Sequence, residues 1–293
     1  MRLLTLILLA VGLWNCTDPI DLTTDFETPQ LVVDAWLTDE SRPQTITLTL
    51  TQDYYDNRLP TPVEDATVTV CQTNLGNECF SFVHQDSGRY VWTPDQGEKL
   101  GEVGEAFALA INRGEDIYGS QTTLYRVPPI DSISVQLEEE QLGLDEGLYA
   151  QLYARDFTGL GDAYLIRTTI NDTFLNRPDE LNLVFDATFD AGSATDGVAF
   201  IFPIRFSINK RDDDGAFVPL LPGDRVSVDI WSLSPQAFTY LSIARDQIQN
   251  GDNGIFQVPV ANAPGNIIGF ETAEDPLGVF NVAAVSTASK VVE

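Results

Sequence analysis

The side chains that most often carry out catalysis are scarce in this chain. Among 293 residues there is a single histidine, His84, which is followed by Asp86 and Ser87 in the stretch "VHQDSG". A Ser-His-Asp triad is assembled by the fold from separate elements, whereas near neighbours of this kind fit a strand that runs into a turn. One histidine also disfavours a zinc site. We therefore predict no catalytic residue and no enzymatic activity.

Acidic side chains are the abundant reactive type, with 44 Asp and Glu against 16 Lys and Arg. Calcium takes six to eight oxygen ligands, and three Asp-rich loops could supply some of them: residues 185–197, 210–217 and 250–254. The strongest fragment is Asp212 and Asp214 in "KRDDDGAF". The alternative is that these loops are ordinary turns, in which Asp, Asn and Gly are common. Calcium is thus the only cofactor that the sequence suggests, and no carboxylate pair for sugar hydrolysis stands out.

The first 15 residues have the pattern of an export signal. Arg2 is followed by the apolar run "LLTLILLAVGLW", residues 3–14, which is too short to cross a bilayer as a helix and has the length of a signal-peptide core. Cys16 begins a segment, residues 16–28, that is acidic and contains Pro19, as expected of a tether. Cys16 is therefore our candidate for lipid attachment, provided that the other two cysteines pair with each other.

Cys71 and Cys79 lie in "ATVTVCQTNLGNECFSF", where two alternating runs flank a turn-rich segment and predict a β-hairpin. If the two cysteines face each other, Val70 opposes Phe80 and the apolar pairs share one face, while the polar pairs share the other. Directly opposed residues of an antiparallel pair are close enough for a disulfide, which export to an oxidising compartment would favour. The alternative is two free thiols. A bridge leaves Cys16 without a partner.

The remaining pattern predicts an all-β protein. Short alternating runs separated by turns occupy residues 29–126 and favour an immunoglobulin-like β-sandwich, with the hairpin in 66–82 and strands expected at 31–37, 44–51, 89–93, 104–112 and 117–124. The "VPPIDS" segment cannot continue a ladder at its two prolines and marks a domain boundary. Residues 129–293 form the second domain, a larger β-sandwich or barrel, with strands expected at 131–137, 148–155, 163–171, 181–186, 198–208, 225–233 and 277–285.

One segment predicts a helix instead. Ser234 is a suitable N-cap, Pro235 suits the first helical position, and Gly251 follows the expected end. Phe238, Leu241, Arg245 and Ile248 then share one stripe, so residues 235–250 should form an amphipathic helix that covers a sheet face or edge.

The net charge of −28 at pH 7 excludes some partners. Such a surface repels phosphate backbones and anionic lipid headgroups, so we expect no nucleic-acid binding and no membrane contact other than a lipid anchor. No second apolar stretch is long enough to cross a membrane as a helix.

Several motifs together resemble lipoproteins that carry the domain of unknown function 4249. They are, in order, "CTDPIDL", "PQLVVDAWLTDE", "VEDATVTV", "VPPIDSISV", "PVANAPGNIIGF" and "LGVFNVAAVS", and they span residues 16–286. The resemblance implies an outer-membrane lipoprotein, palmitoylated at its N-terminal cysteine and exposed at the cell surface, that accompanies a TonB-dependent nutrient transporter. Its ligand is unknown.

Three functions are consistent with these features. The first is a lipid-anchored, non-catalytic binding accessory of such a transporter. The second is a structural or adhesive envelope protein built from sandwiches without a ligand cleft, and the third is a secreted hydrolase. An aromatic-lined concave pocket would favour the first, smooth sandwiches the second, and a close carboxylate pair in a cleft the third.

Overall fold

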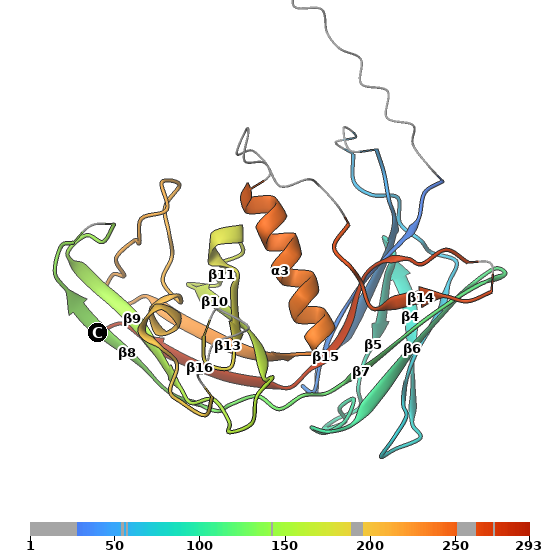
Figure 1. Cartoon of the computed structure of the whole chain (residues 1–293), viewed down its shortest axis with the longest axis horizontal. Coiled ribbons are helices and arrows are strands. Elements are labelled where there is room, and N and C mark those ends of the chain that lie inside the picture. Colours follow the sequence, from blue (N-terminus) through green and yellow to red (C-terminus); the bar gives the residue numbers. More distant parts are fainter. Residues whose placement is uncertain are drawn as a thin grey trace, which may run out of the picture.

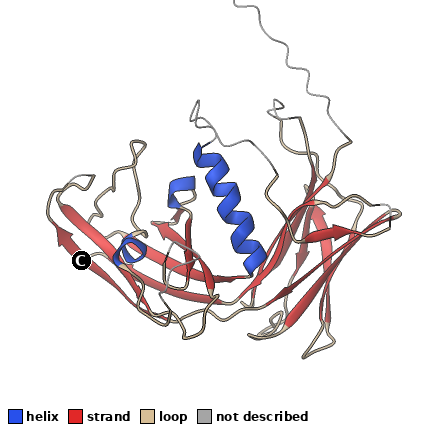
Figure 2. Ribbon diagram, in the orientation of Figure 1, coloured by secondary structure: helices blue, strands red, loops and turns tan. Residues whose placement is uncertain are grey.

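The computed structural model describes residues 28–53, 56, 58–141, 143–188, 196–250, 262–271 and 273–293. The signal, Cys16 and most of the tether therefore lie outside the described residues. Strands dominate, and they form two β units with one long helix standing between them (Figure 1, Figure 2). The predicted all-β class is confirmed.

The first unit is a single curled sheet of nine strands. Along the sheet their order is β14-β7-β6-β3-β4-β5-β2-β1-β15. In chain order the strands are β1 (Leu31–Thr38), β2 (Gln44–Leu50), β3 (Thr67–Gln72), β4 (Cys79–Asp86), β5 (Arg89–Trp92), β6 (Ala106–Arg113), β7 (Asp116–Thr123), β14 (Ile267–Gly269) and β15 (Leu277–Ala283). Their alternating inward residues enclose one hydrophobic core.

The two ends of this sheet meet, so that it nearly closes into a barrel. Asn266, directly before β14, accepts a hydrogen bond from the backbone N–H of Phe280 in β15 and donates one to its carbonyl, both at 2.8 Å. β15 pairs in parallel with β1, with Val32 opposite Leu277. The first unit therefore extends beyond the predicted range 29–126, because two of its strands come from the C-terminal part of the chain.

Gly278 makes the β1–β15 ladder possible. Its φ is +104°, and a Cβ at this position would lie 1.9 Å from the carbonyl oxygen of Val33. Only glycine reaches this backbone conformation without a steric penalty and lets the two strands approach so closely.

The β3–β4 hairpin has the predicted register. Cys71 lies opposite Cys79, and Val70 lies opposite Phe80. The cysteines form the expected disulfide. Val70 and Phe80 are buried in the core, so the disulfide lies on the outer face, as the alternation predicts.

The second unit contains two sheets. Strands β10 (Ala163–Ile170), β11 (Thr173–Phe174), β12 (Asn182–Phe185), β13 (Arg225–Leu233) and β16 (Val285–Val291) form the larger one, and β8 (Ile130–Glu138) pairs with β9 (Gly147–Ala154) in the smaller. The expected strand 277–285 is in fact split between the units, because the chain leaves β15 at Ala284 and continues as β16 in the other sheet (Figure 1).

The expected strand 198–208 is wrong. This apolar run forms a short helix, α2 (Phe202–Phe206), with Pro203 in its first turn. Proline has no N–H to give to a ladder, and its fixed φ suits the start of a helix, so the apolar residues bury themselves from a helix instead. A 3₁₀ turn, η1 (Pro178–Glu180), precedes β12.

The long helix α3 (Pro235–Asn250) has the predicted bounds. Its N-cap is also as predicted, since the Ser234 hydroxyl accepts a hydrogen bond from the Ala237 N–H at 3.2 Å. The first turns pack Ala237, Phe238 and Leu241 into a hydrophobic cluster with residues of both units, whereas Ile248 at the far end is exposed. The helix thus covers the junction with its N-terminal half.

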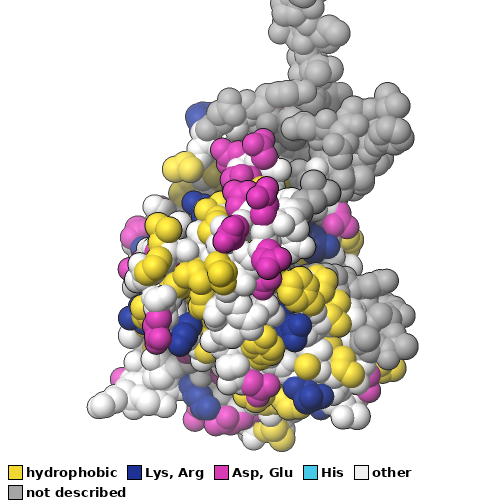
Figure 3. Space-filling view, turned by 90° about the vertical axis from the view of Figure 1, so that its left-hand side faces the viewer, with side chains coloured by type: hydrophobic (Ala, Val, Ile, Leu, Met, Phe, Trp, Pro, Cys, Tyr) yellow, Lys and Arg dark blue, Asp and Glu magenta, His cyan; other side chains and the backbone are white. Residues whose placement is uncertain are grey.

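Charge is unevenly spread over the surface. On the face seen in Figure 3, several acidic side chains gather in the upper middle, and other acidic, basic and hydrophobic side chains are scattered around and below them. Among the described residues, no helix combines the length and apolarity that a membrane crossing needs.

Candidate functional site

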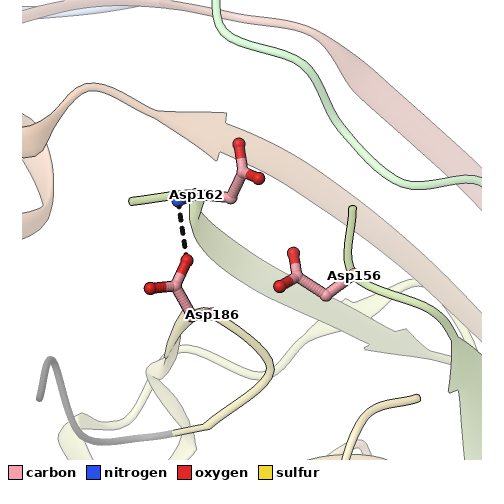
Figure 4. Close-up of side chains that lie close together, drawn as sticks. All are labelled: Asp156, Asp162 and Asp186. Carbon is pink, nitrogen blue, oxygen red and sulfur yellow. Dashed lines mark hydrogen bonds between the residues drawn. The ribbon is translucent and has the colours of Figure 1, made fainter. Parts of the chain in front are cut away.

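Three buried carboxylates meet in the second unit. Asp156 follows β9, Asp162 precedes β10, and Asp186 follows β12, so three strand ends bring them together (Figure 4). Each is at most 7 % exposed, and one oxygen of each lies within 4.8 Å of one oxygen of each of the others. Burial of three carboxylates requires hydrogen bonds or a counter-charge.

The counter-charge is Arg126, from the proline-rich connection between the units. Its Nε lies 2.9 Å from Oδ1 of Asp162 and its Nη2 lies 2.5 Å from Oδ2, which is a bidentate ion pair. Nη2 also donates to the carbonyls of Thr158 and Gly159, and the guanidinium lies over the ring of Phe157. This pair ties the connection to the second unit.

The other two carboxylates have their own donors. Oδ1 of Asp186 accepts the backbone N–H of Gly161 at 2.7 Å and that of Asp162 at 2.9 Å, the bond dashed in Figure 4. Oδ1 of Asp156 accepts the hydroxyl of Tyr164 at 2.7 Å. Burial raises the pKa of Asp156, although the Tyr164 hydrogen bond opposes the shift. Burial also raises the pKa of Tyr164, and its Asp156 partner adds to that rise.

Carboxylate oxygens are ligands that Ca²⁺ and Mg²⁺ prefer, so this cluster is the group of described residues best suited to hold a cation. In the structure, however, Arg126 supplies the positive charge beside Asp162, and backbone or hydroxyl donors occupy oxygens of Asp156 and Asp186. Their burial also keeps them from a bulky glycoside, which a hydrolase would have to reach. We interpret the cluster as a structural joint.

The predicted calcium candidates lie elsewhere. Oδ1 of Asp212 accepts the N–H groups of Asp214 and Ala216 at 3.0 and 2.9 Å, which is the hydrogen bonding of a turn. Of the other acidic loops, 185–197 contributes Asp186 to the cluster, and 251–254 lies outside the described residues. Asp156 and Asp162 were not predicted as site residues, because nothing in the sequence distinguishes them from other acidic residues near turns.

The residues around His84 do not come together as a triad. His84 lies opposite Tyr90 on β5, with ring centroids 5.2 Å apart. The carboxylate of Asp86 instead accepts a hydrogen bond from Nε of Arg89 at 3.0 Å.

An aromatic pocket of about 420 Å³ opens where η1, α2 and α3 meet. Its walls are the rings of Phe202, Phe206 and Phe217, with Pro178, Leu181 and Pro203; its polar lining is Asp179, Asn182, Ser207, Arg211, Arg245 and Gln249. All three helical segments contribute residues to the pocket. A strand at 198–208 would not have placed Phe202 and Phe206 in its wall, so the pocket depends on α2. Pockets of this size and mixed lining are typical of small-molecule sites.

A second hollow, of about 630 Å³, lies on the outside of the first unit. Side chains of β6, β7 and β14 line it, and Ile117, Ile268 and Phe270 remain 41–49 % exposed there. Its lining is mostly apolar, without a charged side chain.

The fold and these hollows define an all-β protein of two joined units, with one aromatic pocket beside the only long helix of the described chain. The chain belongs to the family described as Domain of unknown function (DUF4249), which matches residues 17–289 and so covers both units. No curated protein matches it.

Proposed function

We propose that this protein is a lipid-anchored outer-membrane protein that acts as a non-catalytic binding accessory of a TonB-dependent nutrient transporter. The anchor would be Cys16, at the end of an export-type apolar run and separate from the Cys71–Cys79 disulfide. The transporter is the partner that the resemblance to the family's lipoproteins implies.

The aromatic pocket is the observation that carries the binding role. Phe202, Phe206 and Phe217 form a concave apolar wall beside polar and charged side chains, which a ligand site needs for affinity and orientation. A structural or adhesive protein made of smooth sandwiches has no use for such a pocket, so the pocket supports the binding role over that alternative.

Co-purification tests the transporter partnership. The protein would be isolated from solubilised outer membranes through a tag placed after Glu293, and an unrelated tagged lipoprotein from the same membrane would serve as control. We expect a barrel with a plug domain to co-purify with the protein and not with the control. Repeated purification of the protein without any such barrel would count against the partnership.

Intact mass of the mature protein tests the anchor. We expect a chain that begins at Cys16 and carries the mass increment of a diacylglyceryl group and an acyl chain. An unmodified Cys16, or a retained signal, would overturn the anchor.

A further inference from the structure

The pocket formed by η1, α2 and α3 combines two kinds of recognition surface. One is a wall of aromatic rings, and the other is a pair of arginines, Arg211 and Arg245. Basic side chains are rare in this acidic protein, so two of them in one pocket lining are informative about the ligand.

The aromatic wall is a set of rings that pack on one another. Phe202 and Phe206 are stacked with centroids 5.3 Å apart, and Phe206 meets Phe217 edge-on at 4.9 Å. Tyr149 supports Phe206 from behind at 5.3 Å and is itself fully buried. Phe202 is 49 % exposed, so its ring is available to a flat apolar partner.

The arginines are held in place but keep donors for a ligand. The Arg211 guanidinium lies 3.8 Å from the centroid of Phe217, and its Nη1 donates to the carbonyl of Gly215 at 2.7 Å. Arg245, whose side chain is 23 % exposed, forms an ion pair with its neighbour Asp246, whose Oδ1 accepts hydrogen bonds from both Nε and Nη2 at 3.3 Å. A guanidinium has five N–H donors, so each arginine retains donors beyond those that bond to the described residues.

The acidic side chain in the lining does not cancel this charge. Asp179 is paired with Nη2 of Arg177 at 2.9 Å, and that hydrogen bond holds the pKa of the Asp179 carboxyl below its usual range. The pocket lining therefore contains two arginines and a single aspartate, and that aspartate is paired with an arginine outside the lining.

Asn182 and Gln249 each use one of their two amide N–H donors within the protein, which leaves fewer donors for a neutral sugar. Nδ2 of Asn182 donates to the carbonyl of Ser207 at 2.9 Å, and Nε2 of Gln249 donates to the carbonyl of Pro178 at 2.8 Å. The guanidiniums remain as the principal donors, and they favour an anionic oxygen over a hydroxyl.

We propose that this pocket binds a small organic anion with a flat apolar body, of the aromatic carboxylate type. The ring lies against Phe202 and the carboxylate faces Arg211 and Arg245. This assignment rests on the proposed role of the protein in ligand binding, and it adds the chemical class of the ligand.

The experiment compares three probes by calorimetry on the purified mature chain: 2-naphthoate, its neutral amide and inorganic phosphate. We expect naphthoate to bind, with at least about tenfold weaker binding of the amide and of phosphate, because each lacks one of the two recognised features.

Two variants and a matched control locate the site. Arg245→Gln and Phe202→Ala should each weaken naphthoate binding by about tenfold or more, whereas Arg225→Gln removes the same charge from an exposed position on β13 and should leave it unchanged. Thermal unfolding of each variant shows that it is folded.

Several results would overturn the assignment: no naphthoate binding at millimolar concentration, equal binding of the neutral amide, or unchanged binding in both pocket variants. Failure here is distinguishable from failure of the transporter partnership. Naphthoate binding without a co-purifying barrel contradicts only the partnership, and a co-purifying barrel without naphthoate binding contradicts only the ligand class.

Discussion

Replacement of Arg126 by methionine should destabilise the protein measurably, because it removes the counter-charge of a buried carboxylate. The Asp162 side chain is 8 % exposed and lies beside Asp156 and Asp186, so without Arg126 it faces two like charges in a dry environment. Breaking a fully buried pair from one side costs about 3–5 kcal/mol. Since the Arg126 side chain is 40 % exposed, solvent screening reduces our expectation to about 2 kcal/mol.

The assay is equilibrium urea unfolding at neutral pH, with a second substitution and a matched control. Asp162→Asn in the Arg126→Met background removes the stranded charge and should recover about half of the loss, so the double-mutant cycle should give a coupling energy above about 1 kcal/mol. The control is Arg58→Met. Arg58 makes the same bidentate contact with Asp56 at the surface, where its side chain is 86 % exposed, and its loss should destabilise the protein much less than loss of Arg126.

The reasoning would be refuted if Arg126→Met cost no more than Arg58→Met. It would also fail if the double variant were as unstable as Arg126→Met alone, because the unpaired charge of Asp162 would then not be the cause of the destabilisation.

Two further predictions concern the disulfide and the pH dependence of stability. Replacing both Cys71 and Cys79 by serine should lower the free energy of unfolding by about 2.5 kcal/mol, because the unfolded chain then regains the entropy of the short loop that the disulfide closes. Reductant should destabilise the wild type but not the variant, and equal sensitivity of the two proteins would contradict this prediction. Burial raises the Asp156 pKa above its ordinary 3.8, so the native state holds this proton at pH values where the unfolded chain has lost it, and this group's contribution to stability declines as pH rises through that window. Asp156→Asn should remove that part of the slope in urea unfolding at pH values above Asp156's ordinary pKa of 3.8, and an unchanged slope would exclude Asp156 as its source.

Local signals in the sequence predicted local structure well. The β3–β4 register was predictable because Cys71 opposite Cys79 also places Val70 opposite Phe80 on the buried face, and a slip by one residue would expose that face. The bounds of α3 were predictable from Ser234 and Pro235, whose chemistry acts within one helical turn.

Other elements were missed for identifiable physical reasons. The apolar pattern of 198–208 suits a strand, but Pro203 changes the backbone that these residues can adopt. Strand β16 carries few apolar residues and takes its stability from pairing with β13, and β14 has three residues only. Periodicity detects neither case, because both depend on partners elsewhere in the chain.

The sites could not be read from the sequence for a related reason. The three clustered carboxylates come from three strand ends, and the arginines of the aromatic pocket come from a loop and from α3. One flagged loop did contain Asp186, but only the pairing of β10 with β12 brings it beside Asp162. Spacing along the chain carries no information about contacts of this kind between residues that are distant in sequence.

The parallel pairing of β1 with β15 has a consequence for how the chain folds. Nearly the whole described sequence separates Val32 from its partner Leu277, and Phe280 and Val282 fill part of the first unit's core. Such high contact order slows folding, since the entropy of closing a very long loop must be overcome before the contacts form. During synthesis the edge of β1 therefore stays unpaired until β15 has been made. A fragment that ends before Leu277 would leave that edge open to aggregation.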